Sequence, residues 1–300
     1  MIQPVLSSSV AAALAEGRPV VALESTIFSN LGLPSPANGE ALTRCIAAVE
    51  QAGAVAAVTA VLDGVARVGL EPAEHPRILG AARKAAERDL SVAVAQRWEF
   101  GATTVSASVA LAAAAGIAVF ATGGIGGVHR GAELTGDVSA DLDALAHHHV
   151  VTVCAGAKAF LDLGRTLEYL ETVGVPVLGW QHDDFPAFYT RSSGLRVPHR
   201  VERPGEVATV YANLTRPASG VLVGVPIPEA AELDPGELDR VLVRALEDAE
   251  EEGVVGAAVT PFVLGRIAAA TDGQSVPANL ALAENNARVA GQIAAAIAAS

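Results

Sequence analysis

One lysine of the chain stands in a setting that suits nucleophilic catalysis. Lys158 follows the apolar run at residues 150–154 through the small sequence Ala-Gly-Ala. A lysine must lose its proton before it can attack carbon, and removal from water favours the neutral amine. A surface lysine is the commoner case in general, but the small residues before Lys158 offer little apolar surface on which its stem could lie. We therefore interpret Lys158 as a candidate nucleophile.

A carboxylate follows another apolar run in the same way. Glu24 comes directly after residues 20–23, and loops at the ends of buried strands gather to form clefts in α/β proteins. Burial there would raise the pKa of Glu24 toward the range useful for donating a proton at neutral pH. The alternative left open by this segment is a carboxylate that caps the backbone amides of Ser25 or Thr26.

A glycine-rich segment, residues 120–131, stands directly after a third apolar run. Its glycine spacing does not fit the Rossmann dinucleotide loop, and it lacks the Gly-Lys-Ser/Thr ending of the Walker phosphate loop. The glycines still allow the backbone to approach an anion closely, and His129 and Arg130 could supply positive charge. The open alternative is that the glycines only permit a tight crossing of the chain.

The segment from Asp137 to Leu142 allows two interpretations. Ser139 could be the N-cap of a helix, with Asp141 favoured at the positive end of the helix dipole. Alternatively, the free amides of the helix start bind phosphate while Asp137 ligates a hard cation through oxygen. The capping interpretation is the commoner for such a pattern.

Two further groups of residues have weaker functional signals. We interpret the three histidines at 147–149 as a helix C-terminus rather than a metal site, because consecutive imidazoles on a helix end point in different directions. Trp98, Trp180 and the aromatic segment 185–189 could line a base-binding pocket, although aromatic side chains more often serve packing.

The elements that must position these residues follow an alternating pattern. Short valine-rich runs alternate with longer alanine-rich segments, which is typical of strands buried between helices. Predicted strands cover residues 20–23, 54–62, 91–95, 117–120, 150–154, 175–178 and 220–225. Predicted helices cover residues 38–52, 74–88, 105–115, 140–147, 206–214, 237–252, 260–270 and 278 onward. This pattern predicts an α/β fold, with a single three-layer α/β/α domain over residues 1–300 and a mixed central sheet. The alanine-rich segment 279–298 must pack closely against another surface, in its own subunit or a neighbour's.

Composition narrows the class of protein. The chain has 300 residues, 51% of them hydrophobic, which is enough for one large core. A net charge of −13 argues against a surface that holds a nucleic-acid backbone. Cys45 and Cys154 stand in apolar stretches, which fits unpaired thiols in a reducing cytoplasm. No basic-then-apolar leader and no run of about 18 apolar residues occurs, so we expect neither export nor membrane insertion.

Taken together, these segments resemble the pseudouridine-5'-phosphate glycosidase family, also called the indigoidine synthase A-like family. The resemblance extends through most of the chain, in too many ordered blocks for chance agreement. The matching blocks are Ala-Leu-Glu-Ser-Thr at 22–26, Gly-Ala-Thr-Thr-Val at 101–105, residues 120–133, residues 137–142, Val-Cys-Ala-Gly-Ala-Lys at 153–158, and residues 167–172, 185–189, 226–228, 260–262 and 279–286.

The resemblance implies a reaction and a set of roles. The implied reaction is reversible cleavage of the carbon–carbon bond of pseudouridine 5'-phosphate to uracil and ribose 5-phosphate through a lysine imine. By this resemblance Glu24 is the proton donor, Lys158 is the covalent nucleophile, and Asp137 ligates a manganese ion, one per subunit. The implied substrate contacts are Lys84, Val105, Ser139, Ala140, Asp141 and Asn279, with Thr122 and His129 close to the reacting sugar. The implied partners are small molecules, and the implied assembly is a homotrimer.

Three segments depart from the usual family pattern. Asn30-Leu31 replaces a His-Gly pair, Val58-Thr59 reverses a Thr-Ile pair, and residues 97–100 replace a shorter and usually basic segment. None of them touches the residues to which the resemblance assigns proton donation, nucleophilic attack and metal binding. The last one leaves the local shape of the pocket rim open.

Two competing hypotheses remain. One keeps the imine but changes the substrate, which makes the chain a sugar-phosphate aldolase or lyase. Release of uracil from pseudouridine 5'-phosphate distinguishes that enzyme from a glycosidase. The other is a non-catalytic protein that binds a sugar phosphate or nucleotide, and a pure binder has no need of a desolvated lysine.

Overall fold

The computed structural model describes residues 2–254 and 259–300. Its sheet has the spatial order β1-β4-β3-β2-β7-β8-β11-β9-β10, with β5 and β6 attached at β3. Between β2 and β10 every neighbouring pair of strands is parallel. Near-continuous apolar runs form most of this part, as expected for strands covered on both faces. Its strands are β2 (Val20–Leu23), β7 (Val119–Ala121), β8 (Val151–Cys154), β11 (Val221–Gly224), β9 (Val177–Trp180) and β10 (His199–Val201).

β3 (Val55–Leu62) marks the change from parallel to antiparallel pairing. Its first half runs parallel to β2, and its second half is antiparallel to both β4 (Val65–Val68) and β6 (Phe100–Thr103). β1 (Val5–Leu6) pairs in parallel with β4, and β5 (Arg83–Ala85) pairs in parallel with β6. The sheet is therefore mixed, as the sequence predicted.

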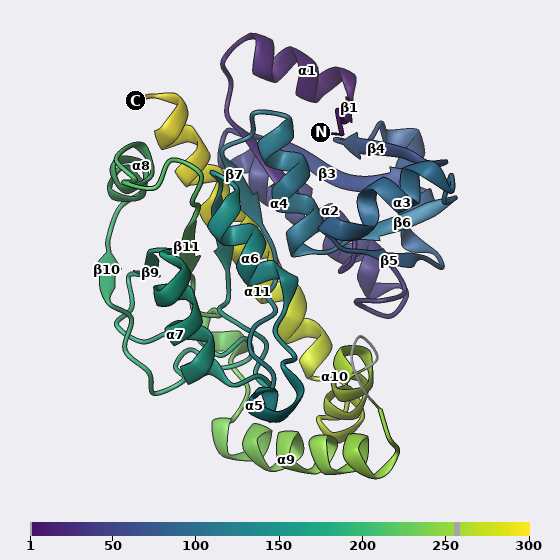
Figure 1. Cartoon of the computed structure of the whole chain (residues 1–300), viewed down its shortest axis with the longest axis vertical. Coiled ribbons are helices and arrows are strands. Elements are labelled where there is room, and N and C mark those ends of the chain that lie inside the picture. Colours follow the sequence, from purple (N-terminus) through teal and green to yellow (C-terminus); the bar gives the residue numbers. More distant parts are fainter. Residues whose placement is uncertain (1, 255–258) are drawn as a thin grey trace.

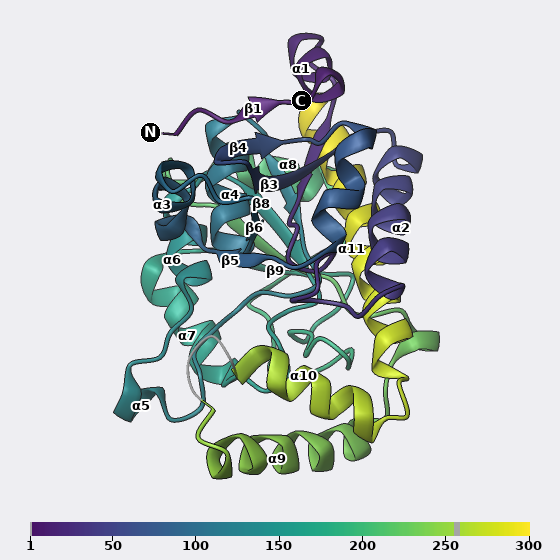
Figure 2. The same ribbon diagram turned by 90° about the vertical axis from the view of Figure 1, so that its right-hand side faces the viewer.

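Helices cover both faces of the sheet, as Figures 1 and 2 show. One face carries α2 (Ala37–Gln51), α8 (Pro204–Ala212) and α11 (Ser275–Ala298), which pack against one another through α11. The opposite face carries α3 (Leu90–Ala95), α4 (Val105–Ala114), α6 (Ala140–His147) and α7 (Leu163–Val173). The predicted three-layer α/β/α architecture is confirmed.

The remaining helical segments lie outside these two layers. α1 (Ser8–Ala15) packs on β2 and β3, and α9 (Pro235–Glu251) packs on α10 (Val259–Ala270), which in turn contacts α11. The shorter segments are α5 (Ala132–Thr135) and three 3-10 turns at Pro72–Leu79, Glu87–Asp89 and Glu229–Ala231. Among the described helices, none combines the length and the apolar character needed to cross a bilayer.

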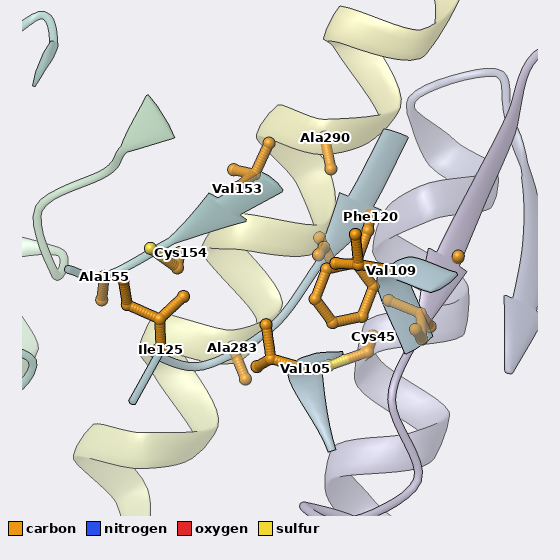
Figure 3. Packing of buried hydrophobic residues seen from close by; sticks show 14 of the residues in the cluster. Cys45, Val105, Val109, Phe120, Ile125, Val153, Cys154, Ala155, Ala283 and Ala290 are labelled. Carbon is orange, nitrogen blue, oxygen red and sulfur yellow. The ribbon is translucent and has the colours of Figure 1, made fainter. Parts of the chain in front are cut away.

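The alanine-rich helix α11 packs directly on the sheet, which confirms the predicted close contact. Ala283 and Ala290 are buried and lie beside the core around Phe120 and Val153 (Figure 3). At Gly291 a side-chain carbon would lie 2.5 Å from the Cβ atom of Ala52, so only glycine permits the close approach of α11 to the end of α2.

Two predicted elements are wrong. Residues 91–95, predicted as a strand because they form a short valine-rich apolar run, belong to helix α3, which buries Leu90 and Ala93 one turn apart. Residues 74–88, predicted as a helix, form a 3-10 turn, a break at Gly80 and then strand β5. Pro76 cannot donate a backbone hydrogen bond, and pairing with β6 makes the following residues extended.

Candidate active site

A cavity of about 690 Å³ lies where β2, β5 and β8 end. Because the carboxyl ends of parallel strands meet at one edge of a sheet, side chains far apart in sequence converge there. Nine of the eleven predicted site residues line this cavity, namely Glu24, Lys84, Val105, His129, Asp137, Ser139, Ala140, Asp141 and Lys158. Thr122 contacts Glu24 through its hydroxyl, and Asn279 is buried outside the cavity wall.

Glu24 is buried at the end of β2, with 8% of the residue exposed. The hydroxyl of Thr122 donates a hydrogen bond to its Oε1. Loss of water raises the pKa of Glu24 from 4.5 to about 7, although the Thr122 hydrogen bond and the charge of Lys158 act in the opposite direction. A carboxyl group with this pKa can both donate and accept a proton near neutral pH.

The alternative role for Glu24, as a cap of the next two amides, is wrong. The backbone N–H of Ser25 donates to the hydroxyl of Thr103, and that of Thr26 donates to the Thr103 carbonyl. The carboxylate of Glu24 is thus free of its own turn and faces the cavity.

Lys158 reaches the same cavity from the segment after β8. The backbone of Gly156 has φ +78°, and a Cβ atom there would lie 1.9 Å from the Pro186 carbonyl oxygen, so glycine is required in this turn. The N–H of Lys158 donates to the carbonyl of Ile125 at 3.2 Å, which ties the lysine to the glycine-rich loop. Lys158 is partly buried and lies close enough to Glu24 for its charge to lower the pKa of that carboxyl.

Ser139 is the N-cap of α6, because its hydroxyl accepts a hydrogen bond from the N–H of Asp141 at 3.2 Å. The carboxylate of Asp141 is buried and accepts the N–H of Ser106 at 3.0 Å and that of Gly126 at 2.8 Å. Asp141 therefore joins the starts of two helices to the glycine-rich loop. The capping interpretation is confirmed for Ser139, and the cavity wall contains both residues.

The glycines of the loop serve close packing. A Cβ atom on Gly126 would lie 2.2 Å from the Ser139 hydroxyl, and one on Gly124 would lie 2.5 Å from the ring of Phe188. Close packing therefore requires glycine at these two positions, and Gly126 also lines the cavity. Arg130 lies outside the wall of the cavity, whereas His129 is part of it.

Lys84 and His129 are basic side chains in the wall of the cavity. Partial loss of water is the main cause that lowers the pKa of Lys84, and the charge of Lys158 is the second. Part of the Lys84 side chain remains exposed to solvent. Partial burial also lowers the pKa of His129, and the neighbouring Asp137 opposes this shift. The Nδ1 atom of His129 lies 3.8 Å from Asp137 Oδ2. The cavity wall therefore holds the basic side chains of Lys84, Lys158 and Arg88. The carboxylates of Asp137 and Asp141 lie in the same wall.

Asp137 is the one predicted metal ligand, and its side chain is 40% exposed. Within residues 2–254 and 259–300, no three His, Cys, Asp or Glu side chains gather in a metal-binding cluster. A lone exposed carboxylate fits a hard cation that keeps most of its water or shares the ligand's oxygens. It does not fit a cation held wholly by protein ligands.

Helix α11 supports the glycine-rich loop from behind. The Nδ2 group of Asn286 donates to the carbonyls of Thr122 at 2.8 Å and Gly123 at 3.3 Å. Asn279, one predicted substrate contact, is buried beside Gly123, and its Oδ1 has no hydrogen-bond partner among the described residues. The structure does not bring Asn279 to the cavity wall.

The predicted aromatic lining of the cavity is wrong, whereas the predicted helix end at the three histidines is confirmed. The aromatic ring in the cavity wall is Phe160, two residues after the lysine, and none of the aromatic residues considered from sequence lines it. In the sequence, the place of Phe160 two residues after Lys158 was the signal that could have identified it as a cavity residue. α6 ends at His147 as predicted, and the next two histidines turn to Glu87 and to the ring of Tyr211.

Comparisons with known proteins identify the family. The profile of the family described as "Indigoidine synthase A like protein" matches residues 9–296. The pseudouridine-5'-phosphate glycosidase of Cupriavidus pinatubonensis is 49% identical over 98% of this chain and 94% of its own length. That of Sorangium cellulosum is 50% identical over 97% of this chain and 93% of its own.

Solved structures agree with the sequence comparison. A prealnumycin C-glycosynthase in complex with ribulose 5-phosphate has a TM-score of 0.90 and 37% identity, over 98% of this chain and 97% of that one. An indigoidine synthase A-like protein from Thermotoga maritima has a TM-score of 0.84 and 36% identity, over 94% of each chain. The predicted resemblance and the prediction of an enzyme are confirmed. This chain belongs to the indigoidine synthase A-like family of pseudouridine-5'-phosphate glycosidases.

Proposed function

We propose that this enzyme reversibly cleaves the C-glycosidic bond of pseudouridine 5'-phosphate, giving uracil and ribose 5-phosphate through an imine on Lys158. The observation that carries the proposal is a cavity in which a buried carboxyl with a pKa of about 7 lies beside a lysine. The names of the relatives support the substrate, and the neighbour bound to ribulose 5-phosphate supports a pentose phosphate as the ligand.

The first step opens the sugar ring. A carbon-linked base is a poor leaving group, so direct displacement by water is slow and a nitrogen nucleophile is needed. The amine of Lys158 bonds to C1' when it is unprotonated, and Glu24 donates its proton to the ring oxygen as the C1'–O4' bond breaks. The raised pKa of Glu24 provides the protonated carboxyl for this step.

The second step expels uracil. The nitrogen of Lys158 releases one proton on attack, and C5 of uracil gains one proton, so the number of protons is unchanged. The nitrogen lone pair then forms the C1'=N bond, and the electrons of the C1'–C5 bond return to the uracil ring. Water adds to C1', which releases ribose 5-phosphate and restores the free amine and the protonated Glu24. The same steps in reverse form the carbon–carbon bond.

The rest of the cavity would bind the phosphate and the ion. Lys84 and the start of α6 at Ser139 would hold the phosphate, since amines and the amides of a helix start bind phosphate and both groups line the cavity. Asp137 would hold the proposed manganese ion, which would order water and balance negative charge near the substrate. Its exposed carboxylate fits a largely hydrated ion.

The sequence makes a direct test of the imine possible, because the chain has only two lysines, Lys84 and Lys158. Borohydride added during turnover should reduce the imine and leave a ribose phosphate adduct on Lys158, detected by mass spectrometry of peptides. Lys158→Ala should release no uracil and form no adduct, whereas Lys84→Ala should keep the adduct on Lys158. Turnover by Lys158→Ala, or an adduct on Lys84, would overturn the nucleophile assignment.

The identity of the substrate can be tested by the change in absorbance when uracil is released from the nucleotide. Pseudouridine 5'-phosphate should yield free uracil, and uracil with ribose 5-phosphate should yield the nucleotide. An adduct with ribose 5-phosphate but no uracil release would instead favour a sugar-phosphate lyase.

A further inference from the structure

Four hydroxyl side chains form a water-excluded cluster directly beneath the turn that carries Glu24. Ser25, Thr59, Thr103 and Ser108 are each 0% exposed. The Thr59 hydroxyl lies 2.8 Å from both the Thr103 and the Ser108 hydroxyls, and 3.1 Å separates those of Ser25 and Thr103. These residues come from the turn after β2 and from β3, β6 and α4, so the cluster joins four elements.

The cluster holds both peptide neighbours of Glu24. On one side, the Thr59 hydroxyl donates to the carbonyl of Leu23 at 3.1 Å. On the other side, the N–H of Ser25 donates to Thr103 Oγ1 at 3.3 Å, and the N–H of Thr103 donates to Ser25 Oγ at 3.0 Å. The backbone of Glu24 therefore has a fixed attachment before and after it.

Thr103 makes the largest share of these contacts. Besides its bonds to Ser25, its carbonyl accepts the N–H of Thr26 at 3.2 Å and the Thr26 hydroxyl at 2.7 Å. Its own hydroxyl donates to the carbonyl of Thr59 at 2.8 Å. Thr103 thus fastens the two residues that follow Glu24 to the end of β6.

The same residue lies next to the opposite wall of the cavity. Thr103 pairs with Ala85 in the β5–β6 register, one position beyond the pair of Lys84 with Ala102. The following residue, Thr104, donates its N–H to the Ala85 carbonyl at 2.9 Å and leads into α4. One residue of β6 therefore connects the Glu24 turn with the strand that carries Lys84.

We infer that Thr103 is a positioning residue, whose buried hydroxyl fixes the Glu24 carboxyl relative to the Lys84 side of the cavity. The inference rests on the proposed function only in taking Glu24 as the proton donor. The order Val58-Thr59 contributes to the cluster, because successive side chains of a strand point to opposite faces of the sheet. With the reverse order, the threonine would stand at position 58 and its hydroxyl would lie on the face of β3 away from Thr103.

The hydroxyl matters because two backbone groups on either side of it bond to it in a region that is closed to water. If Thr103 lost its oxygen, the N–H of Ser25 would be left without its acceptor and the Thr59 carbonyl would lose its donor. The turn would relax toward other partners, and a shift of about 1 Å in a catalytic group can lower a rate by about 100-fold.

The test compares Thr103→Val with a matched control, Thr152→Val. Thr152 is also 0% exposed in a central strand, but its hydroxyl has no hydrogen-bond partner among the described residues. Thr103→Val should lower the kcat of pseudouridine 5'-phosphate cleavage by about 10- to 100-fold with KM changed by less than about threefold. Thr152→Val should leave both constants within about twofold of the natural enzyme, because it removes no hydrogen bond and nearly preserves the side-chain shape.

Two readouts separate positioning from a general loss of structure. Thr103→Ser keeps the oxygen and should recover kcat to within about threefold of the natural enzyme, even if its Tm falls. Thr103→Val should also displace the ionisation of Glu24 in the pH profile of kcat by roughly half a unit or more. In a Glu24→Gln background, Thr103→Val should change the residual rate by less than about twofold.

The outcomes distinguish this inference from the proposed function. If Glu24→Gln keeps full activity, the proton-donor assignment fails first, whatever Thr103 does. If Glu24→Gln is inactive while folded Thr103→Val has the natural kcat and pH profile, the positioning role of Thr103 is wrong. Should Thr103→Val fail to fold, kcat and its pH profile are compared between the natural enzyme, Thr103→Ser and Thr59→Val instead. An unchanged kcat and pH profile in Thr59→Val, or no recovery of kcat in Thr103→Ser, would overturn it.

Discussion

Replacing Glu24 with glutamine should make the protein more stable at alkaline pH while it removes most of the activity. Burial raises the pKa of this carboxyl from 4.5 to about 7 in the folded protein. Between these two values the folded state keeps a proton that the unfolded chain has lost. The free energy of unfolding must therefore fall as pH rises through this window, and the full contribution is present only below pH 4.5.

The size of the effect follows from the pKa difference. A shift from 4.5 to about 7 corresponds to about 3 kcal/mol of stability lost by pH 8. Glutamine cannot ionise, so Glu24→Gln should lack this loss. The stability of the variant relative to the natural protein should increase by about 3 kcal/mol from pH 4.5 to pH 8, or about 5 to 10 °C in Tm.

The assay is denaturant or thermal unfolding over this pH range at one protein concentration. Glu50→Gln serves as the control, because Glu50 is exposed on α2 and removal of its charge should leave the pH dependence parallel to that of the natural protein. Parallel curves for Glu24→Gln would refute the reasoning, since they would show that the carboxyl titrates alike in the folded and unfolded chain.

Two further predictions concern the cavity walls. Gly126→Ala should lower both stability, by about 1 to 3 kcal/mol, and kcat, because its Cβ atom would lie 2.2 Å from Ser139 Oγ and 2.8 Å from Asp141 Oδ2. Gly80→Ala, with open space around the added carbon, should change neither in the same unfolding and rate measurements. Lys84→Met should raise the KM for pseudouridine 5'-phosphate by about 10- to 100-fold, through loss of one charge-assisted hydrogen bond to phosphate. An unchanged KM would show that the phosphate binds elsewhere.

Much of the layered fold could be predicted from local pattern. The apolar runs that became β2 and β8 are continuous enough to be read as buried strands, and α6 has the predicted limits because Ser139 marks its start. Strand β5 could not be found in this way. Its three residues include two cations and no apolar alternation, and it is extended because β6 pairs with it.

The site residues can likewise be divided into those that local sequence predicts and those whose contacts depend on the folded structure. Glu24 and Lys158 could be proposed because each follows a buried strand, and the ends of parallel strands converge. The bonds of Asp141 to Ser106 and Gly126 join segments brought together only by folding, so local spacing gave no sign of them. Asn279 was assigned from family resemblance alone, and its buried position behind the loop has no local sequence signal.

The support that Asn286 gives to the glycine-rich loop has a consequence for biosynthesis. Its amide holds the carbonyl of Thr122, 164 residues earlier in the chain, and Thr122 in turn bonds to Glu24. While the ribosome is still making the later strands, the loop lacks this attachment, and such distant contacts are slow to form. The emerging chain can therefore build much of its sheet before it has a complete catalytic centre, and competence should appear only once residue 286 has left the exit tunnel.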